Sequence, residues 1–418
     1  MTEPRYVALP GLTCRAAGSG RGYLLLHERL GLKLRISARI AHALDLFLEP
    51  RALVGEARSG VTPAVRRALA PLIAARALVP EAEADDWDEG PLAEPHARAR
   101  RGPSIGLPGG LGDLDGPPGG RRFAVIGAPS EHGSHASSGA QHGPALIRDR
   151  FRFFGPLSDV EAGARLLDLD ARRVYELPRS LHTIDVGNVR RVPGEGLPAF
   201  GARLEFVVDA AARRGFTPVT LGGDHAITLF PLRALLRHHP EIGILHFDAH
   251  HDHYLDPSAS GPHSHASVFA LAMREAGIRR LFQLGLRTLD VIPAGHRRRT
   301  DRRIRFVTAR ELSRRTPKEV FAGLPRQLPW YLSFDVDCMA PHLARETGTR
   351  ELGGIEYYQG LDLIQYAARH LRIVGADFVE VARQDGRVNL AAEIVARYLL
   401  ELLVARLPRQ RLTSYLYA

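Results

Sequence analysis

The feature that most constrains this chain is a pair of short acidic runs, each placed directly behind an apolar segment. The run FDAHHDHY follows the segment IGIL and holds Asp248, His250 and Asp252, whereas SFDVDCMAP follows WYL and holds Asp335 and Asp337. Because residues two apart in a strand lie on the same face, each run directs its polar side chains to one place. Two such runs at strand ends predict a metal site.

A third run, VTLGGDHAI, has the same plan, with a Gly pair that allows close backbone approach before Asp224 and His225. The predicted ligands from the three runs are His225, Asp248, His250, Asp252, Asp335 and Asp337. Four carboxylates carry too much negative charge for one divalent ion, but two ions can share them. Oxygen and imidazole ligands without sulfur favour manganese over a structural zinc site. The order of metal affinities alone does not exclude zinc or nickel.

The competing interpretation is that each run is a turn or a solvated loop end, as a single DxD or DxH pattern usually is. Three such runs behind strand-like segments, ordered along one α/β pattern, favour the site with two metals. Strands that alternate with helical segments such as FPLRALLRHH predict a doubly wound parallel sheet in three layers. In such a sheet the site lies beyond the carboxyl ends of the strands.

The three runs resemble the signatures GGDH, DAHxD and SxDxDxxDP of the ureohydrolase family, which includes arginase, agmatinase and formimidoylglutamase. The resemblance continues in IGAPSEHGSHASSGAQHGPALIR, in DVGNV and in QLGLRT, and it extends from about residue 122 to about residue 406. It implies an arginase-like fold and a dinuclear manganese amidinohydrolase.

The resemblance also implies a role for each ligand. His225 and Asp252 would hold one manganese ion, His250 and Asp337 the other, and Asp248 and Asp335 would bridge the two ions. Bound metal lowers the pKa of water from about 15.7 towards 7. Hydroxide would attack the carbon of a guanidinium group, and the tetrahedral intermediate would collapse to urea and an amine.

Further residues are assigned by the same resemblance. Glu380 in ADFVEVA would pair with the substrate guanidinium, and His265 in GPHSHASVF would pass protons between the site and solvent. Asp252 is counted with these catalytic residues as well as with the ligands. The alternatives are a surface acid at 380 and a solvated loop histidine at 265, with His263 as a competitor. Ser333 and Asp224 would orient the ligands.

The chain also departs from the family pattern. Ala340 stands in place of the third aspartate of DxDxxDP, and Ala226 in place of a serine after GGDH. Behind Asp252 the chain has His253 and Tyr254, where arginases bind the α-carboxylate of the substrate, and Arg383 begins the segment in which arginases carry an Asn-Pro pair. The determinants for free L-arginine are therefore not visible.

Composition narrows the remaining function classes. The net charge of +10 comes almost entirely from arginine, since lysine occurs only at Lys33 and Lys318, and this indicates codon bias more than a nucleic-acid partner. The two cysteines, Cys14 and Cys338, make no disulfide framework. No apolar run reaches the length of about 18 residues that spans a bilayer. We therefore expect a cytoplasmic protein without a membrane or nucleic-acid partner.

Three parts are predicted along the chain. Residues 1–80 contain two helical patterns, from Ser37 and from Thr62, with the strand-like segments GYLLL and LKLRI, and they resemble a small α+β winged-helix module. Residues 81–121 are charged and then rich in Gly and Pro, which predicts a flexible linker. Residues 122–418 form the catalytic domain.

The extra module suggests that the substrate is arginine-derived and bound to a peptide or a carrier, with a leader peptide or carrier held by residues 1–80. The alternatives are an agmatinase or guanidino-acid hydrolase that acts on a free small molecule, a mononuclear zinc hydrolase of the deacetylase type, and a non-catalytic binding protein. The resemblance also implies a homo-oligomer.

Overall fold

The structure, a computed structural model, describes most of the chain from residue 121 onward and short pieces before it. The longer described ranges are 121–134, 139–151, 165–177, 181–191, 195–254, 263–290, 301–383 and 389–412. The shorter pieces are 5–8, 13–16, 23–27, 32–37, 51–52, 67, 69–70, 72–73, 78–80, 97–98, 105, 107–108 and 114.

The chain divides into two compact units, one of Met1–Pro95 with Arg190–Phe200 and one of His96–Val189 with Gly201–Ala418. The described strands of the smaller unit form two antiparallel sheets of three strands, in the orders β2-β3-β4 and β5-β1-β6. Their bounds are β1 (Arg5–Ala8), β2 (Thr13–Ala16), β3 (Tyr23–His27), β4 (Leu32–Ile36), β5 (Arg51–Ala52) and β6 (Leu78–Pro80).

The predicted strand segments GYLLL and LKLRI lie in β3 and β4, which pair antiparallel. The helical pattern from Ser37 lies outside the described residues after its first residue. Of the pattern from Thr62, the described residues before β6 are helical, and they are Arg67, Leu69, Ala70, Leu72 and Ile73. The winged-helix assignment stays a prediction.

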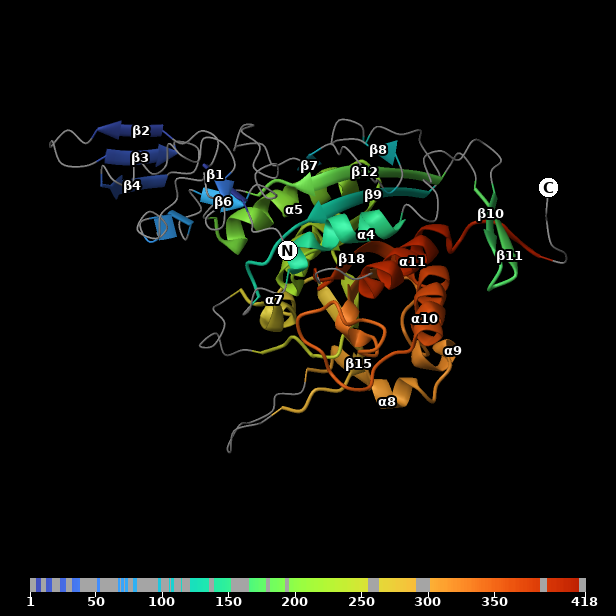
Figure 1. The fold of residues 1–418 in the computed structure, drawn as a ribbon. Helices are drawn as coiled ribbons and strands as arrows, with labels where there is room; N and C mark the ends of the chain where they lie inside the picture. The colour runs from blue at the N-terminus through green and yellow to red at the C-terminus, as the bar shows by residue number, and fades with distance from the viewer. Residues whose placement is uncertain are drawn as a thin grey trace, which may run out of the picture. The chain divides into compact units, whose positions relative to one another are not determined.

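The larger unit is built on a ten-stranded sheet in the order β16-β15-β14-β17-β18-β13-β9-β12-β7, with β8 also paired to β12 (Figure 1). All pairs from β16 to β12 are parallel, and β7 is antiparallel. Its strands are β7 (Ala97–Arg98), β8 (Leu107–Pro108), β9 (Arg121–Ala128), β12 (Leu181–Val189), β13 (Thr217–Gly222), β14 (Ile242–Phe247), β15 (Ile278–Leu286), β16 (Ile304–Thr308), β17 (Pro329–Asp335) and β18 (Arg372–Val379).

Buried apolar strands and flanking helices explain why this sheet forms. All six residues of β14 are buried, as expected for a parallel strand covered on both faces. The helices are α4 (Gly143–Phe151), α5 (Leu197–Arg213), α6 (Leu229–Leu236), α7 (Val268–Ala272), α8 (Ala309–Leu312), α9 (Pro317–Val320), α10 (Tyr357–His370) and α11 (Leu390–Val404). The predicted parallel sheet with flanking helices is confirmed.

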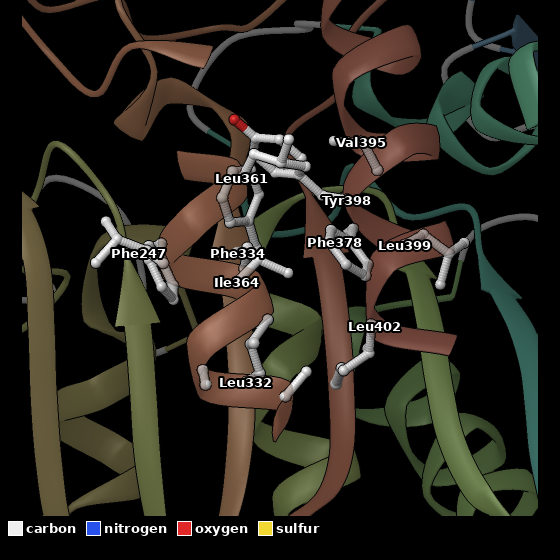
Figure 2. Close-up of a cluster of buried hydrophobic side chains, with 14 of the residues drawn as sticks. Phe247, Leu332, Phe334, Leu361, Ile364, Phe378, Val395, Tyr398, Leu399 and Leu402 are labelled. Atoms are coloured by element: carbon white, nitrogen blue, oxygen red, sulfur yellow. The ribbon is translucent and has the colours of Figure 1, made fainter. Parts of the chain in front are cut away.

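Helix α11 packs against α4 and α10 and closes one part of the core (Figure 1). Twelve of its fifteen residues are buried, as its apolar pattern predicts. Figure 2 shows Tyr398 of this helix close to Phe334 and Phe378 of the sheet, and the rings of Tyr398 and Phe334 meet edge to face at 5.5 Å. The tight packing fixes the strands whose ends carry the polar runs.

Part of the predicted linker joins this unit. Strands β7 and β8 pair with β12, and Ile105 and Leu114 are fully buried. The backbone N–H of Ile105 donates to Asp185 Oδ2 at 3.1 Å. These contacts favour a catalytic unit that starts before residue 122. The predicted boundaries after residues 80 and 121 stay predictions.

A separate small sheet has the order β10-β11-β19, with strands β10 (Arg165–Asp168), β11 (Arg173–Glu176) and β19 (Arg409–Arg411). Among the described residues, none of the helices has the length and apolar character that a membrane crossing requires.

Candidate metal centre

Four neighbouring strands, β14, β17, β18 and β13, bring the predicted site residues together at one edge of the sheet. Asp248 directly follows β14, Asp335 ends β17, Glu380 directly follows β18, and His225 lies three residues beyond β13 at the start of the 3-10 helix η5 (His225–Thr228). Because parallel strands all end at the same edge, runs that are far apart in sequence meet there.

The first cluster surrounds His225. Its Nδ1 lies 3.1 Å from Asp248 Oδ2, 3.0 Å from Asp252 Oδ2 and 3.2 Å from Asp335 Oδ2. This buried nitrogen nevertheless makes no hydrogen bond of acceptable geometry with any described residue. Burial lowers the pKa of His225, but the three carboxylates outweigh it and raise the pKa well above its ordinary value. A nitrogen held among three carboxylates without a hydrogen bond fits a cation between them.

The second cluster consists of Asp248, His250 and Asp337, whose candidate ligand atoms lie within 4.8 Å of one another. His250 Nδ1 lies 2.9 Å from Asp337 Oδ2 and 3.4 Å from Asp248 Oδ1. Asp335 adjoins both clusters, because its Oδ1 accepts a hydrogen bond from the backbone N–H of Asp337 at 2.8 Å. Asp248 belongs to both clusters, so two cations bound here would share it.

The carboxylates of the centre face histidines. Among the described residues, the ion pairs of Asp248, Asp252, Asp335 and Asp337 are with histidines alone, with no arginine or lysine. Burial and the charges of Asp337 and Asp248 raise the pKa of Asp335 well above its usual range, and burial with Asp248 raises the pKa of Asp337 to about 6. Crowded carboxylates of this kind suit divalent cations.

Behind His225 lies a hydroxyl and carboxylate network that the sequence analysis found only in part. His225 Nε2 is 2.9 Å from Ser333 Oγ, and Ser333 donates to Asp377 Oδ1 at 2.7 Å. Tyr331 and Thr228 also donate to Asp377, at 2.7 and 2.8 Å. Since the Ser333 proton goes to Asp377, Ser333 must accept from His225 Nε2, so in the neutral imidazole Nδ1 is the nitrogen that can bind a cation. Asp377 was missed, although a lone acid inside the apolar strand β18 was a signal.

Glu380 and His265 lie in contact. Glu380 Oε1 accepts from the backbone N–H of His225 at 2.9 Å and is 3.2 Å from His265 Nδ1. Glu380 has a φ of 60°, and Asp252 a φ of 48°, a backbone region that costs energy for residues other than glycine. Burial lowers the pKa of His265, but Glu380 outweighs it and raises the pKa. The structure thus joins His265 to the cluster through Glu380.

Asp224 organises the turn that carries His225. Its Oδ1 accepts from the backbone N–H of Ala226 at 3.0 Å and so caps η5. Its Oδ2 accepts from Ser130 Oγ and from the backbone N–H of Gly133, both at 3.1 Å. Burial and the charge of Glu380 raise the pKa of Asp224 to about 6.

Two buried residues beside Asp248 were also missed. His246 Nε2 is 2.7 Å from Asp248 Oδ2, and Gln283 Nε2 is 2.9 Å from His246 Nδ1. The alternation that aligned Asp248, His250 and Asp252 extends back to His246, so this histidine could have been found. Gln283 could not, because its pairing with His246 depends on the register of β14 with β15.

The rim of the site contains residues that follow the ligand runs. Tyr254 donates to Asp290 Oδ1, and His251 Nε2 lies 3.1 Å from Asp290 Oδ2. The rings of His251 and Tyr254 are 4.3 Å apart. Arg287 holds the segment after β17, with its guanidinium donating to the carbonyl oxygen of Asp337 at 2.7 Å. Residues 255–262 and 384–388 of the predicted selectivity segments lie outside the described part.

Comparison with known proteins agrees with this geometry. The sequence model of the Arginase family matches residues 121–404. A guanidinobutyrase from Pseudomonas aeruginosa is 30% identical over 312 residues, which cover 73% of this chain and 91% of the relative. An agmatinase from Photorhabdus laumondii is 29% identical over 294 residues, covering 69% of this chain and 88% of the relative.

Solved structures with the same fold include a proclavaminate amidino hydrolase from Streptomyces clavuligerus, with 25% identity, a TM-score of 0.55, and coverage of 74% of this chain and 99% of the other. A hypothetical agmatinase from Burkholderia thailandensis has 26% identity and a TM-score of 0.54, with coverage of 70% and 88%. These relatives confirm the predicted enzyme class, a hydrolase acting on C–N bonds of linear amidines. The chain belongs to the arginase family.

Proposed function

We propose that this chain hydrolyses the guanidino group of a free small molecule to urea and an amine at a centre of two manganese ions. The relatives are named for free guanidino compounds, as guanidinobutyrase, guanidinopropionase and agmatinase. They support this substrate class better than a guanidino group tethered to a peptide or carrier. The leader-peptide or carrier role of residues 1–80 and the homo-oligomer stay predictions.

The observation that carries the proposal is the shared cluster around Asp248. One ion would be held by His225 and Asp252 and the other by His250 and Asp337, with Asp248 and Asp335 between them. The short distances from His225 Nδ1 to Asp252 Oδ2, 3.0 Å, and from His250 Nδ1 to Asp337 Oδ2, 2.9 Å, support this division. Two bound divalent ions lower the pKa of a water molecule and so supply a nucleophile near neutral pH.

Glu380 binds and orients the substrate in this mechanism. Both hydrogen bonds of its side chain among the described residues end on Oε1, so Oε2 can accept from a guanidinium group. Charge-assisted hydrogen bonds of this kind fix the planar group and hold its central carbon beside the ligand cluster. The contact from the backbone of His225 fixes Glu380 relative to that cluster.

His265 moves a proton between the site and solvent. Its side chain is 16% exposed, and its Nδ1 faces Glu380. Glu380 raises the pKa of His265, and an imidazole at this place can give a proton to the departing amine and regain one from water.

The experiment that tests the proposal measures urea released by the manganese-loaded chain from agmatine, guanidinobutyrate, guanidinopropionate, arginine and arginine-containing peptides. We expect urea from at least one free compound, and loss of it in Asp337→Asn but not in Glu241→Gln, which removes an exposed carboxylate. Urea from peptides alone would favour the tethered substrate. One tightly held zinc ion without urea release would favour the deacetylase-type alternative.

A further inference from the structure

His246 is a fully buried imidazole that could be mistaken for a metal ligand. It has a nitrogen within 4.8 Å of ligand atoms on His225, Asp248 and Asp252. Its Nε2 lies 2.7 Å from Asp248 Oδ2, and its ring lies 4.1 Å from that of Phe269. Whether this nitrogen carries a proton decides whether His246 competes with Asp248 for a cation or supports it.

Gln283 determines the position of that proton. Gln283 Nε2 is 2.8 Å from the carbonyl oxygen of His251, an atom that only accepts hydrogen bonds, so the amide nitrogen and not the amide oxygen must lie there. The same nitrogen is 2.9 Å from His246 Nδ1. With one N–H used on His251, the other donates to His246 Nδ1, which must therefore be unprotonated. A neutral imidazole then carries its proton on Nε2.

We propose that His246 is a positioning residue that Gln283 holds with its proton on Nε2, so that it donates a hydrogen bond to Asp248 Oδ2 and does not bind the metal. This rests on the proposed dinuclear centre. The bond fixes the carboxylate that both clusters share. The rigid pairing of His246 with Gln283 across β14 and β15 supports the arrangement.

The contrast with His225 strengthens the assignment. Behind the ring of His225 lies Ser333, which accepts a hydrogen bond from Nε2, so in the neutral ring the nitrogen facing the centre is free to bind metal. Behind the ring of His246 lies Gln283, which donates a hydrogen bond to Nδ1, so the proton of the neutral ring lies on the nitrogen facing the centre. The group on the far side of each imidazole distinguishes the ligand from the supporting donor.

Two substitutions of similar size test this role. In His246→Gln the amide nitrogen can occupy the place of Nε2 and still donate to Asp248, whereas His246→Met has no donor. We expect His246→Met to lower the manganese affinity by about 10- to 100-fold. The manganese affinity of His246→Gln should stay close to that of the unmodified chain. Affinity is measured by titrating the metal-free chain with manganese and following the paramagnetic resonance signal of the free ion, with thermal melting as a check on folding.

Equal losses in the two variants would contradict the proposal, since a ligand or a packing role would not be rescued by glutamine. Unchanged affinity in His246→Met would also overturn it.

A second measurement is independent of metal and of turnover. In the metal-free chain, nitrogen NMR of imidazole-labelled protein should show His246 with its proton on Nε2, and Gln283→Leu should disturb this state. A proton on Nδ1 in the unmodified chain would refute the proposal. If the chain bound no manganese but showed the Nε2 proton, the dinuclear function would fail while the hydrogen-bond assignment would stand.

Discussion

The Arg148–Asp185 pair and the candidate metal centre are both buried clusters of charge in the larger unit. They differ in the groups that face their buried carboxylates. Arg148 donates to both oxygens of Asp185, each at 2.7 Å, and the backbone N–H groups of Ile105 and Gly187 donate to the same carboxylate. The acid and the base are both fully covered. This cluster completes its own charge balance within the chain.

The candidate metal centre has no comparable pairing with an arginine among the described residues. Burial raises the pKa of Asp185, yet Arg148 outweighs it and the result is a lowered pKa. At the centre, burial and neighbouring acids raise the pKa of Asp335 and Asp337. Crowding buried carboxylates against one another is costly, so the difference fits a cation-binding role for the centre, whereas the Arg148 pair serves the fold.

Among the proposed changes, chelation of divalent metal should have the largest effect on activity. Removal of divalent metal should abolish urea release from the guanidino substrate, because the proposed nucleophile depends on the ions, and manganese should restore it. Urea release and metal content are measured together on the same sample. Full turnover at less than one metal ion per chain would contradict the dinuclear centre.

Arg148→Leu should have the next largest effect, and on stability alone. It leaves Asp185 buried without its partner, which typically costs about 3–5 kcal/mol of unfolding free energy. Manganese affinity of the folded protein should not change, since Arg148 contacts none of the proposed ligands. Arg279→Leu, which removes an arginine from an exposed pair, is the control. Denaturant titration of both variants, with and without manganese, measures the unfolding free energy and the stabilisation by manganese. A large loss of manganese affinity in Arg148→Leu would show that the two clusters are coupled.

Glu380→Gln should affect turnover and spare the metal. The substitution keeps the size of the side chain and one acceptor oxygen, but it replaces the other oxygen by an amide donor and removes the charge that pairs with guanidinium. We therefore expect a loss of about 10²–10³ in kcat/KM, about 2.7–4 kcal/mol of transition-state stabilisation. Both metal ions should remain. Steady-state kinetics and metal analysis check this result, and turnover equal to that of the unmodified chain would remove Glu380 from the site.

Some contacts of the candidate site could be predicted from the sequence and others could not, depending on whether the two partners lie close together in the sequence. Alternation within single runs found Asp248, His250, Asp252, Asp335 and Asp337. The reason differs from the one predicted, because β14 ends at Phe247 and Asp337 lies in a 3-10 helix, so most of these residues follow the strands and do not alternate within them. Asp377 and Gln283 escaped prediction because each acts on a residue of a neighbouring strand. The cross-strand register that pairs Ser333 with Asp377 is visible only once the sheet is assembled.

The predicted linker shows the same limit. A Gly- and Pro-rich composition indicated no packed core there, yet Ile105 is fully buried and donates to Asp185. A single apolar residue can be covered by a core built elsewhere in the chain, and local composition carries no information about it.

The two clusters should also change the unfolding free energy with pH in opposite directions. These effects should be smaller than those of the changes above. The folded pKa of Asp337, about 6, lies above the ordinary value of 3.8, so the folded chain binds more protons between these values and unfolding free energy falls as pH rises through that window. Asp335 acts in the same direction. Asp185 acts oppositely, because its lowered pKa gives stability that is present above 3.8 and is lost as pH falls through the folded value.

Denaturant titrations of the metal-free chain at several pH values measure these slopes. Asp337→Asn should flatten the decline between about pH 4 and 6, because a group that cannot titrate adds no proton linkage. Saturating manganese should reverse the slope, since ions bind the deprotonated ligands and add binding free energy that grows with pH. If the decline persists unchanged in Asp337→Asn and with manganese, the crowded carboxylates are not its source. The contrast between a cluster that balances its own charge and one that binds a cation would then lose its thermodynamic support.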